Sequence, residues 1–224
     1  MRSVLSLRLE PPQPDRAGEF EDGECYPESL VERFLEEYTR PGDLVLDPFA
    51  GSGTTLVVAE RMGRRPLGFE IHPERVAIVA SRLQDPTAIR QGDVRLLDPA
   101  DLPSFDLVMT SPPYMTNTGH LENPLSGYRT LDGDYRAYVE ELTSILERLG
   151  RNLTDGGRIV VNVANLDYDG AVTPLAFDLG HALSRVLTFE REVVLDWDPP
   201  IEWLTNDYCL IFTAKGDDVR DRCR

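Results

Sequence analysis

The sequence is poor in the residues that build metal sites and disulfide frameworks. Its 224 residues include three cysteines and three histidines. The cysteines, Cys25, Cys209 and Cys223, are odd in number and far apart, so they predict neither a disulfide framework nor a metal site. We therefore expect idle or buried thiols, no bound metal, and solvent-exposed or capping roles for the dispersed histidines.

Long apolar runs are also missing. No stretch approaches the roughly 18 to 20 consecutive apolar residues that a membrane span needs, and the first ten residues, MRSVLSLRLE, lack the apolar core of a signal peptide. We therefore expect a cytoplasmic protein without a membrane partner. An apolar content of 41% over this length is enough for one well-buried domain and somewhat short for two.

Positive charge is scarce, with 23 lysines and arginines against 39 acidic residues and a net charge of -16. A protein that binds nucleic acid unaided normally presents a basic surface to the phosphates. If this chain acts on DNA, we expect its arginines to gather on one face or a partner subunit to supply the basic surface.

Helical and strand patterns alternate along most of the chain. Residues 1–25 are expected to form an N-terminal arm with order beginning near Tyr26, residues 26–216 one domain, and residues 217–224 a tail. The fold class is α/β, a doubly wound and mostly parallel seven-stranded sheet whose last strand is antiparallel. The predicted helices cover residues 27–38, 54–62, 74–83, 135–149 and 174–186, and the predicted strands cover residues 44–46, 66–69, 88–90, 105–109, 158–164, 192–197 and 208–213.

A glycine-rich turn, DPFAGSGT at residues 47–54, follows the first predicted strand of the domain. Glycines there allow a sharp turn and a close approach of backbone to ligand beside a helix N-terminus. Glu70 ends the next strand about twenty residues later, at the offset where nucleotide-binding α/β units place a carboxylate for ribose hydroxyls, and Asp93 follows the third strand. Asp47, Glu70 and Asp93 thus predict an acidic rim around a cofactor. The alternatives are an ordinary strand-to-helix turn and, for Asp47, a helix cap.

A second motif, Ser111-Pro112-Pro113-Tyr114, follows the predicted strand 105–109. The two prolines fix the backbone and remove donors, which leaves carbonyl acceptors facing outward and holds Tyr114 as a platform. Such a pocket suits a planar ring that carries an amino group. The alternative is a rigid turn with the tyrosine packed inside.

These motifs resemble those of the class I S-adenosylmethionine-dependent methyltransferases, and within them the DNA aminomethyltransferases that modify cytosine N4 or adenine N6. The resemblance covers Tyr26 to Lys215 and implies S-adenosylmethionine as cofactor, S-adenosylhomocysteine as product, DNA as partner and a restriction-modification role. It implies that Ser111, Pro112, Pro113 and Tyr114 are catalytic. The candidate cofactor-binding residues are Tyr26, Pro27, Asp47, Pro48, Phe49, Ala50, Gly51, Ser52, Gly53, Thr54, Glu70, Ile71, Asp93, Val94 and Ser111.

The resemblance also implies a mechanism. The serine form of the tetrapeptide is typical of cytosine N4 enzymes, whereas aspartate and asparagine forms are typical of adenine N6 enzymes. Ser111 Oγ and the Pro112 carbonyl would accept the amine hydrogens, and Tyr114 would stack on an extruded base. Two features depart from the family pattern: the cofactor motifs precede the catalytic motif, and no insertion is large enough for a target-recognition domain. The loop 115–132 is the one obvious candidate for base or groove contacts.

Other interpretations stay open at this point. The same chemistry could act on RNA, a protein amide or a small amine, which the acidic charge favours. Alternatively, the chain could be a non-catalytic cofactor-binding subunit of a modification complex, although such a subunit has no physical need for the full motif set. Trp197 and Trp203 could form a substrate-facing lip or belong to the core.

Overall fold

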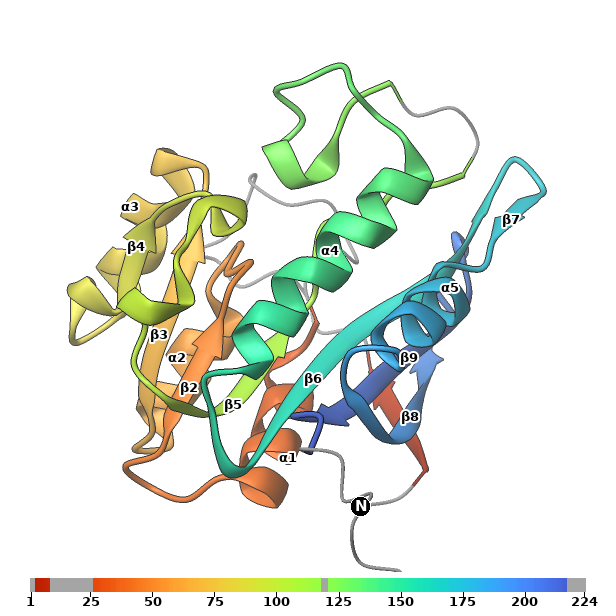
Figure 1. The fold of residues 1–224 in the computed structure, drawn as a ribbon. Helices are drawn as coiled ribbons and strands as arrows, with labels where there is room; N and C mark the ends of the chain where they lie inside the picture. Colours follow the sequence, from red (N-terminus) through yellow and green to blue (C-terminus); the bar gives the residue numbers. More distant parts are fainter. Residues whose placement is uncertain (1–2, 9–25, 118–120, 217–224) are drawn as a thin grey trace, which may run out of the picture.

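A computed structural model describes residues 3–8, 26–117 and 121–216, and within them one twisted sheet forms the centre of the molecule (Figure 1). The strands run in the order β1-β8-β9-β6-β5-β2-β3-β4, and β7 pairs with β6 alone. Their bounds are β1 Val4–Arg8, β2 Leu44–Asp47, β3 Arg65–Glu70, β4 Ile89–Gln91, β5 Phe105–Thr110, β6 Leu153–Tyr168, β7 Ala171–Thr173, β8 Thr188–Asp198 and β9 Leu204–Thr213.

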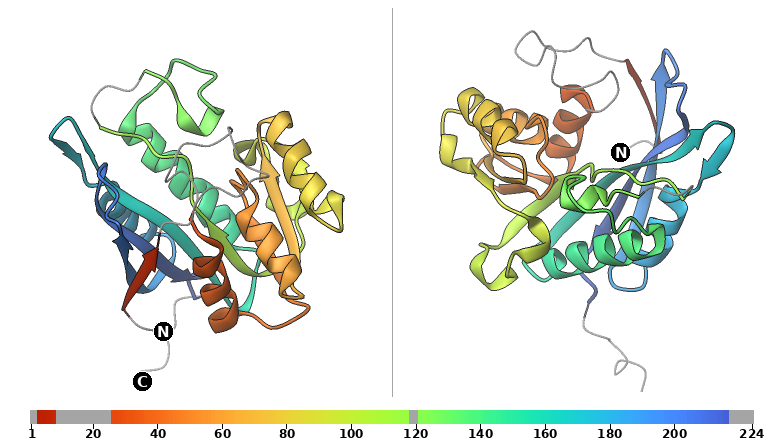
Figure 2. Two further views of the ribbon diagram at one scale, coloured as in Figure 1. Left: turned by 180° about the vertical axis from the view of Figure 1, so that it is seen from behind. Right: turned by 90° about the horizontal axis from the view of Figure 1, so that it is seen from above.

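Five helices cover the two faces of this sheet in the described residues: α1 Glu28–Tyr38, α2 Thr54–Arg61, α3 Pro73–Arg82, α4 Tyr135–Gly150 and α5 Leu175–Leu183. The view from above in Figure 2 shows α1 to α3 on one side of the sheet and α4 and α5 on the other. Separate apolar clusters lie under the two layers. Leu30 and Phe34 of α1 pack with Val45 and Leu107 on one side, whereas Leu142 of α4 packs in the cluster on the other. The predicted doubly wound α/β architecture is therefore confirmed.

The antiparallel end of the sheet also matches the prediction. β9 lies between β6 and β8 and runs antiparallel to both, because β8 returns to β9 directly, without an intervening helix. The strand expected at residues 192–197 lies within the longer β8, and the strand expected at residues 208–213 is the C-terminal part of the longer β9. The strand expected at 158–164 is longer as well, and its end continues with β7 as a hairpin beyond the sheet edge (Figure 1).

Two strands were not predicted. Residues 4–8 were assigned to an unordered arm, but Val4–Arg8 forms β1, which pairs in parallel with Val194 to Asp198 of β8. Its five residues alternate apolar Leu5 and Leu7 with polar Ser6 and Arg8, and the strand forms against the open edge of β8. With β7, it raises the strand count of the described sheet from the expected seven to nine. Residues 9–25 and the expected tail 217–224 lie outside the described residues.

Three parallel strands that neighbour one another place their carboxyl ends at one edge. Leu46 of β2 pairs with both Leu67 of β3 and Val108 of β5, so the segments that follow these strands emerge side by side. In an open α/β sheet this edge is where ligands bind. None of the described helices combines the length and the apolar character that crossing a membrane requires.

Candidate active site

A cavity of about 710 Å³ lies at the carboxyl edge of the sheet. Both predicted motifs line it, although some sixty residues separate them in sequence. Of the predicted site residues, the cavity is lined by Tyr26, Asp47, Pro48, Phe49, Ala50, Gly51, Ser52, Thr54, Glu70, Ile71, Asp93, Val94, Ser111, Pro112, Pro113 and Tyr114. Pro27 and Gly53 do not line it. Pro27 is the N-cap residue of α1, and a Cβ on Gly53 would lie 2.5 Å from Val79 Cγ1.

Glu70 ties the glycine-rich turn to β3. One of its carboxylate oxygens accepts the Gly51 N–H at 3.0 Å, and the other accepts the His72 N–H at 2.9 Å. Gly51 has a φ of 50°, and a Cβ built on it would meet one atom within 4 Å, Phe49 O at 3.9 Å. The turn therefore leaves open space beside its backbone, where a side chain would intrude on a ligand.

Asp47 is almost fully buried at the end of β2, with an exposure of 2%. Its carboxylate accepts hydrogen bonds from Thr110 Oγ1 at 2.7 Å and from the Phe49 N–H at 3.1 Å, and Tyr26 Oη donates to it at 3.4 Å. Burial raises the pKa of Asp47 to about 6 and outweighs these hydrogen bonds, which act in the opposite direction. Asp47 does not cap α2, because the N-cap residue is Gly53 and no side chain caps it.

Asp93 has a different environment from the other two acids. The side chain of Arg95 forms a bidentate ion pair with it, with a shortest distance of 2.6 Å, and the Arg95 N–H also binds it. Burial disfavours the charged form of Asp93, but the hydrogen bonds from Arg95 outweigh that effect and lower its pKa. Asp93 is thus held as an anion at the cavity wall.

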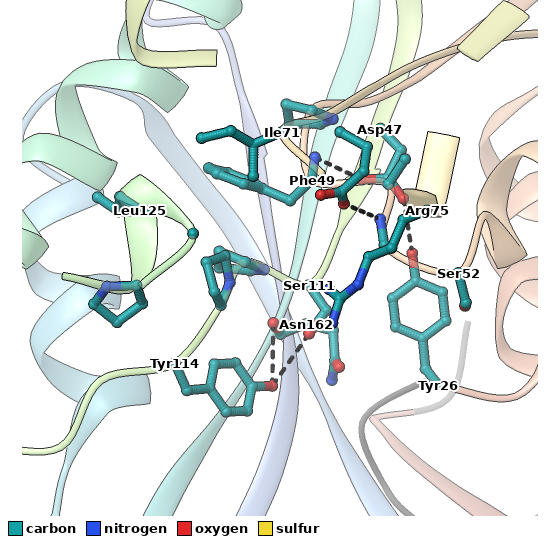
Figure 3. A pocket seen from close by; sticks show the side chains of 18 of the residues that line it. Tyr26, Asp47, Phe49, Ser52, Ile71, Arg75, Ser111, Tyr114, Leu125 and Asn162 are labelled. Carbon is teal, nitrogen blue, oxygen red and sulfur yellow. Dashed lines mark hydrogen bonds between the residues drawn. The ribbon is translucent and has the colours of Figure 1, made fainter. Parts of the chain in front are cut away.

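The tetrapeptide lies across the cavity from Tyr26 and Asp47 (Figure 3). Ser111 Oγ donates to Tyr114 Oη at 3.4 Å, and Tyr114 Oη donates to the carbonyl of Asn162 at 3.5 Å, so both contacts are long. The Pro113 carbonyl accepts the hydroxyl of Tyr138 at 2.8 Å. Among the described residues, the Pro112 carbonyl has no hydrogen-bond partner. Burial raises the pKa of Tyr114 well above its usual range, so the phenol is neutral.

The predicted long loop 115–132 is irregular but anchored in its described part, and residues 118–120 of it lie outside the described residues. Residues 124–126 form a single 3-10 turn capped by Asn123. Ser126 Oγ accepts hydrogen bonds from the N–H groups of Arg129 and Thr130. Leu125 and Tyr128 line the cavity, so this loop forms one of its walls.

Several cavity residues escaped the sequence analysis. Asn162 of β6 and Asp207 of β9 are both buried, and the cavity also meets His72, Arg75 and Tyr168. No short motif contains Asn162 or Asp207, and their proximity depends on the register between two distant strands. Trp197 and Trp203 both line the cavity and also pack partly against the core. In the part of the chain that is described, no group of three His, Cys, Asp or Glu side chains could hold a metal ion.

Comparison with known proteins gives a family match for part of the chain. Residues 12–81 match the family described as DNA methylase. The type II methyltransferase M2.DpnII of Streptococcus pneumoniae is 50% identical over 58 residues, which are 26% of this chain and 22% of that protein. The DNA adenine methyltransferase YhdJ of Escherichia coli is 47% identical over 57 residues, 25% of this chain and 19% of that protein. The chain thus spans about a fifth of the length of these curated relatives.

Solved structures agree in fold over most of the chain. A TehB-like S-adenosylmethionine-dependent methyltransferase from Corynebacterium glutamicum has a TM-score of 0.54 at 17% identity and covers 86% of this chain and 90% of its own. The M protein of the type I restriction enzyme EcoKI has a TM-score of 0.56 at 18% identity, with 89% of this chain and 46% of its own covered. The chain therefore has the class I methyltransferase fold and is similar in sequence, over about 26% of its length, to the S-adenosylmethionine-dependent DNA aminomethyltransferases.

Proposed function

We propose that this chain transfers a methyl group from S-adenosylmethionine to an exocyclic amine of a base in DNA, with cytosine N4 as the preferred acceptor. The observation that carries the proposal is the single cavity lined both by the glycine-rich turn with Glu70 and by Ser111 to Tyr114. A cofactor bound at the turn and an amine bound at the tetrapeptide would share one cavity, as transfer between them requires.

The glycine-rich end of the cavity fits the cofactor. The open space beside Gly51 admits a ligand close to the backbone, and Glu70 retains free lone pairs for ribose hydroxyls after binding two backbone N–H groups. Asp47, which pairs with no cationic side chain among the described residues, supplies negative charge suited to a cationic ligand, whereas the charge of Asp93 is balanced by Arg95. Bound S-adenosylmethionine supplies a methyl group that its sulfonium already activates, so the residues of this chain need only hold the amine in line with it.

The tetrapeptide end fits an amine on a planar ring. Such an amine is a poor nucleophile because its lone pair is delocalised, and acceptors that bind its N–H groups turn the lone pair away from the ring. Ser111 Oγ and the free Pro112 carbonyl can supply two acceptors, since the long contact between Ser111 and Tyr114 costs little to break. Methyl transfer then forms an N–C bond, breaks a C–S bond and releases one amine proton to water.

The base preference rests on Ser111, the residue typical of cytosine N4 enzymes in the family that the chain resembles. Adenine N6 is the second candidate, because the relative YhdJ, 47% identical over 57 residues, is a DNA adenine methyltransferase. Cytosine and adenine are both aromatic rings with an exocyclic amine, so Ser111 Oγ and the Pro112 carbonyl could accept hydrogen bonds from the amine of either base. The two rings differ in size, so the depth of the cavity at the tetrapeptide would decide which base is methylated.

The charge of the chain favours a partner in DNA binding. A net charge of -16 opposes approach to a polyanion, and the EcoKI M protein that shares the fold belongs to a type I restriction enzyme. We propose that a partner subunit or a further protein segment supplies the basic surface or target recognition. The salt dependence of DNA affinity would reveal such a partner, because its phosphate contacts make the affinity fall more steeply as the salt concentration rises.

The test is to incubate the purified protein with methyl-labelled S-adenosylmethionine and genomic DNA at low salt, digest the DNA and identify the labelled nucleoside by mass spectrometry. N4-methylcytosine is the expected product. N6-methyladenine would overturn the base preference but keep the chemistry. Cofactor binding without labelled DNA, while RNA or protein becomes labelled, would overturn DNA as the acceptor. Binding without transfer to any of these substrates would favour a non-catalytic subunit.

A further inference from the structure

A buried carboxylate lies at the tetrapeptide end of the cavity, outside both sequence motifs. Asp207 of β9 lines the cavity with an exposure of 4%. It accepts three hydrogen bonds, from Asn162 Nδ2 at 2.8 Å, from Trp197 Nε1 at 3.0 Å and from the Tyr208 N–H at 2.8 Å. Among the described residues, no cationic side chain pairs with it. Its negative charge is therefore held by neutral donors alone, which is a costly arrangement.

These hydrogen bonds fix the orientation of a neighbouring amide. Asn162 donates one Nδ2 hydrogen to Asp207 and a second to the Tyr208 carbonyl at 3.2 Å. Both donors of the amide are thereby used, which leaves its Oδ1 as the atom that can accept a hydrogen bond from a ligand. Asn162 lines the cavity, and its backbone carbonyl accepts the Tyr114 hydroxyl, so the amide lies beside the tetrapeptide (Figure 3).

The same carboxylate holds an aromatic wall. Trp197 lines the cavity from β8, and its indole N–H is bound to Asp207. Asp207 therefore orients one acceptor and one apolar ring that both face the proposed position of the base. A core that needed only stability would be served better by an apolar residue at this position, because removing a buried charge and its partners together is often neutral or stabilising.

We propose that Asp207 is a positioning residue that fixes the Asn162 amide, so that its Oδ1 accepts an amine N–H of the base beside Ser111 and Pro112, and that holds the Trp197 indole against the ring. This inference rests on the proposed function, because it assigns a third acceptor to the same amine. Asp207 itself acts through Asn162 and Trp197 and does not contact the reacting atoms.

The first test compares Asp207→Asn with Asp106→Asn. Asp106 also accepts two hydrogen bonds, from the Leu44 N–H and Thr154 Oγ1 at 2.8 Å each, but it does not line the cavity. An amide at position 207 replaces one acceptor oxygen by an NH2 group, so either the Trp197 indole or the pair of donors from Asn162 and Tyr208 loses its acceptor. We expect kcat for DNA methylation to fall about 10- to 100-fold for Asp207→Asn. The affinity for S-adenosylmethionine should stay within about twofold, because Asp207 contacts Asn162, Trp197 and Tyr208 and none of the residues of the glycine-rich turn.

A reciprocal double variant provides the rescue. Combining Asn162→Asp with Asp207→Asn restores one amide and one carboxylate, keeps an acceptor oxygen at position 162 and leaves an oxygen for the Trp197 indole. We expect kcat at least about fivefold above that of the weaker single variant, within the usual coupling of paired side chains. If the losses of kcat in the two single variants simply add in the double variant, the proposed pairing of Asn162 with Asp207 is overturned.

A signal that does not depend on DNA keeps the two proposals distinct. The chain has two tryptophans, so the Trp197 indole N–H gives one of two indole signals in a nitrogen-15 spectrum. It should shift in Asp207→Asn and stay in place in Asp106→Asn. An active wild type with an equally active Asp207→Asn variant, or an unmoved indole signal, would overturn the role of Asp207. A wild type that transfers no methyl group would overturn the proposed function and Oδ1 as an amine acceptor, while the indole signal would still test the Asp207 contacts.

Discussion

Replacing Glu70 by glutamine gives a quantitative test of the cofactor pocket. Each carboxylate oxygen already accepts one backbone N–H, from Gly51 and from His72. A glutamine has one oxygen and one NH2 group, so one backbone donor would face another donor. The charge that strengthens hydrogen bonds from ribose hydroxyls is lost as well. Because hydrogen bonds to a charged group contribute about 1.5–3 kcal/mol each, losing one should weaken cofactor binding about 10- to 150-fold.

The assay is isothermal titration calorimetry of S-adenosylmethionine against wild type, Glu70→Gln and Glu60→Gln. Glu60 is a matched control, because its two oxygens accept the N–H groups of Gln84 and Asp85 at 2.7 and 3.1 Å, outside the cavity. Both variants should lose some thermal stability, but only Glu70→Gln should lose affinity. Unchanged affinity in Glu70→Gln, or an equal loss in Glu60→Gln, would refute the assignment of Glu70 to the cofactor.

Three further substitutions probe separate features. Tyr114→Ala should reduce transfer to DNA by about 5- to 150-fold, since stacking of a base on an aromatic ring is worth about 1–3 kcal/mol. Tyr114→Phe should stay active, because the hydroxyl contacts are long. Radiolabel transfer rates measure both variants, and loss of cofactor affinity in Tyr114→Ala would show a structural role instead. The pKa of Asp47, about 6 in the folded protein, lies above its unfolded value, so the folded state binds the proton more tightly and gains stability as the pH falls from 7 towards 4.5. Urea unfolding at several pH values should show the wild type gaining stability relative to Asp47→Asn across that window, and a pH-independent difference would contradict the raised pKa. The free energy of unfolding of Gly53→Ala should be about 1–3 kcal/mol lower than that of Gly42→Ala, because both glycines have positive φ but only a Cβ at position 53 would clash with Val79. Equal unfolding midpoints in urea would show that α3 moves to accommodate the added methyl group without loss of stability.

The parts of the site that the sequence could predict are local. DPFAGSGT and Ser-Pro-Pro-Tyr each carry their own turn geometry, and both follow strands with clear apolar patterns. Their strand ends neighbour one another because a doubly wound sheet places them there. The predicted cofactor-binding residues therefore line one cavity, apart from Pro27 and Gly53. Pro27 is the N-cap residue of α1, and Gly53 lacks a side chain that would clash with Val79 of α3.

The features that escaped prediction depend on tertiary pairing. β1 has five residues and forms against the free edge of β8. Asp207 sits opposite Ala164, two positions beyond the pairing of Asn162 with Cys209, and that register between distant strands brings Asp207 to Asn162. The Arg95 partner of Asp93 lies two residues away in sequence, but nothing in the sequence indicated that the two side chains would turn toward each other.

One hydrogen bond links the two motifs directly. Thr110 ends β5 immediately before Ser111, and its hydroxyl donates to Asp47 at the end of β2 at 2.7 Å. Because β2 and β5 pair in parallel, any shift of one strand along the other would break this bond and move Ser111 relative to the glycine-rich turn. The separation between the two motifs is therefore set by two paired and buried strands, where close packing resists displacement. Changes in the length or charge of the loops around the cavity would therefore leave the distance between the glycine-rich turn and Ser111, over which the proposed transfer would take place, unaltered.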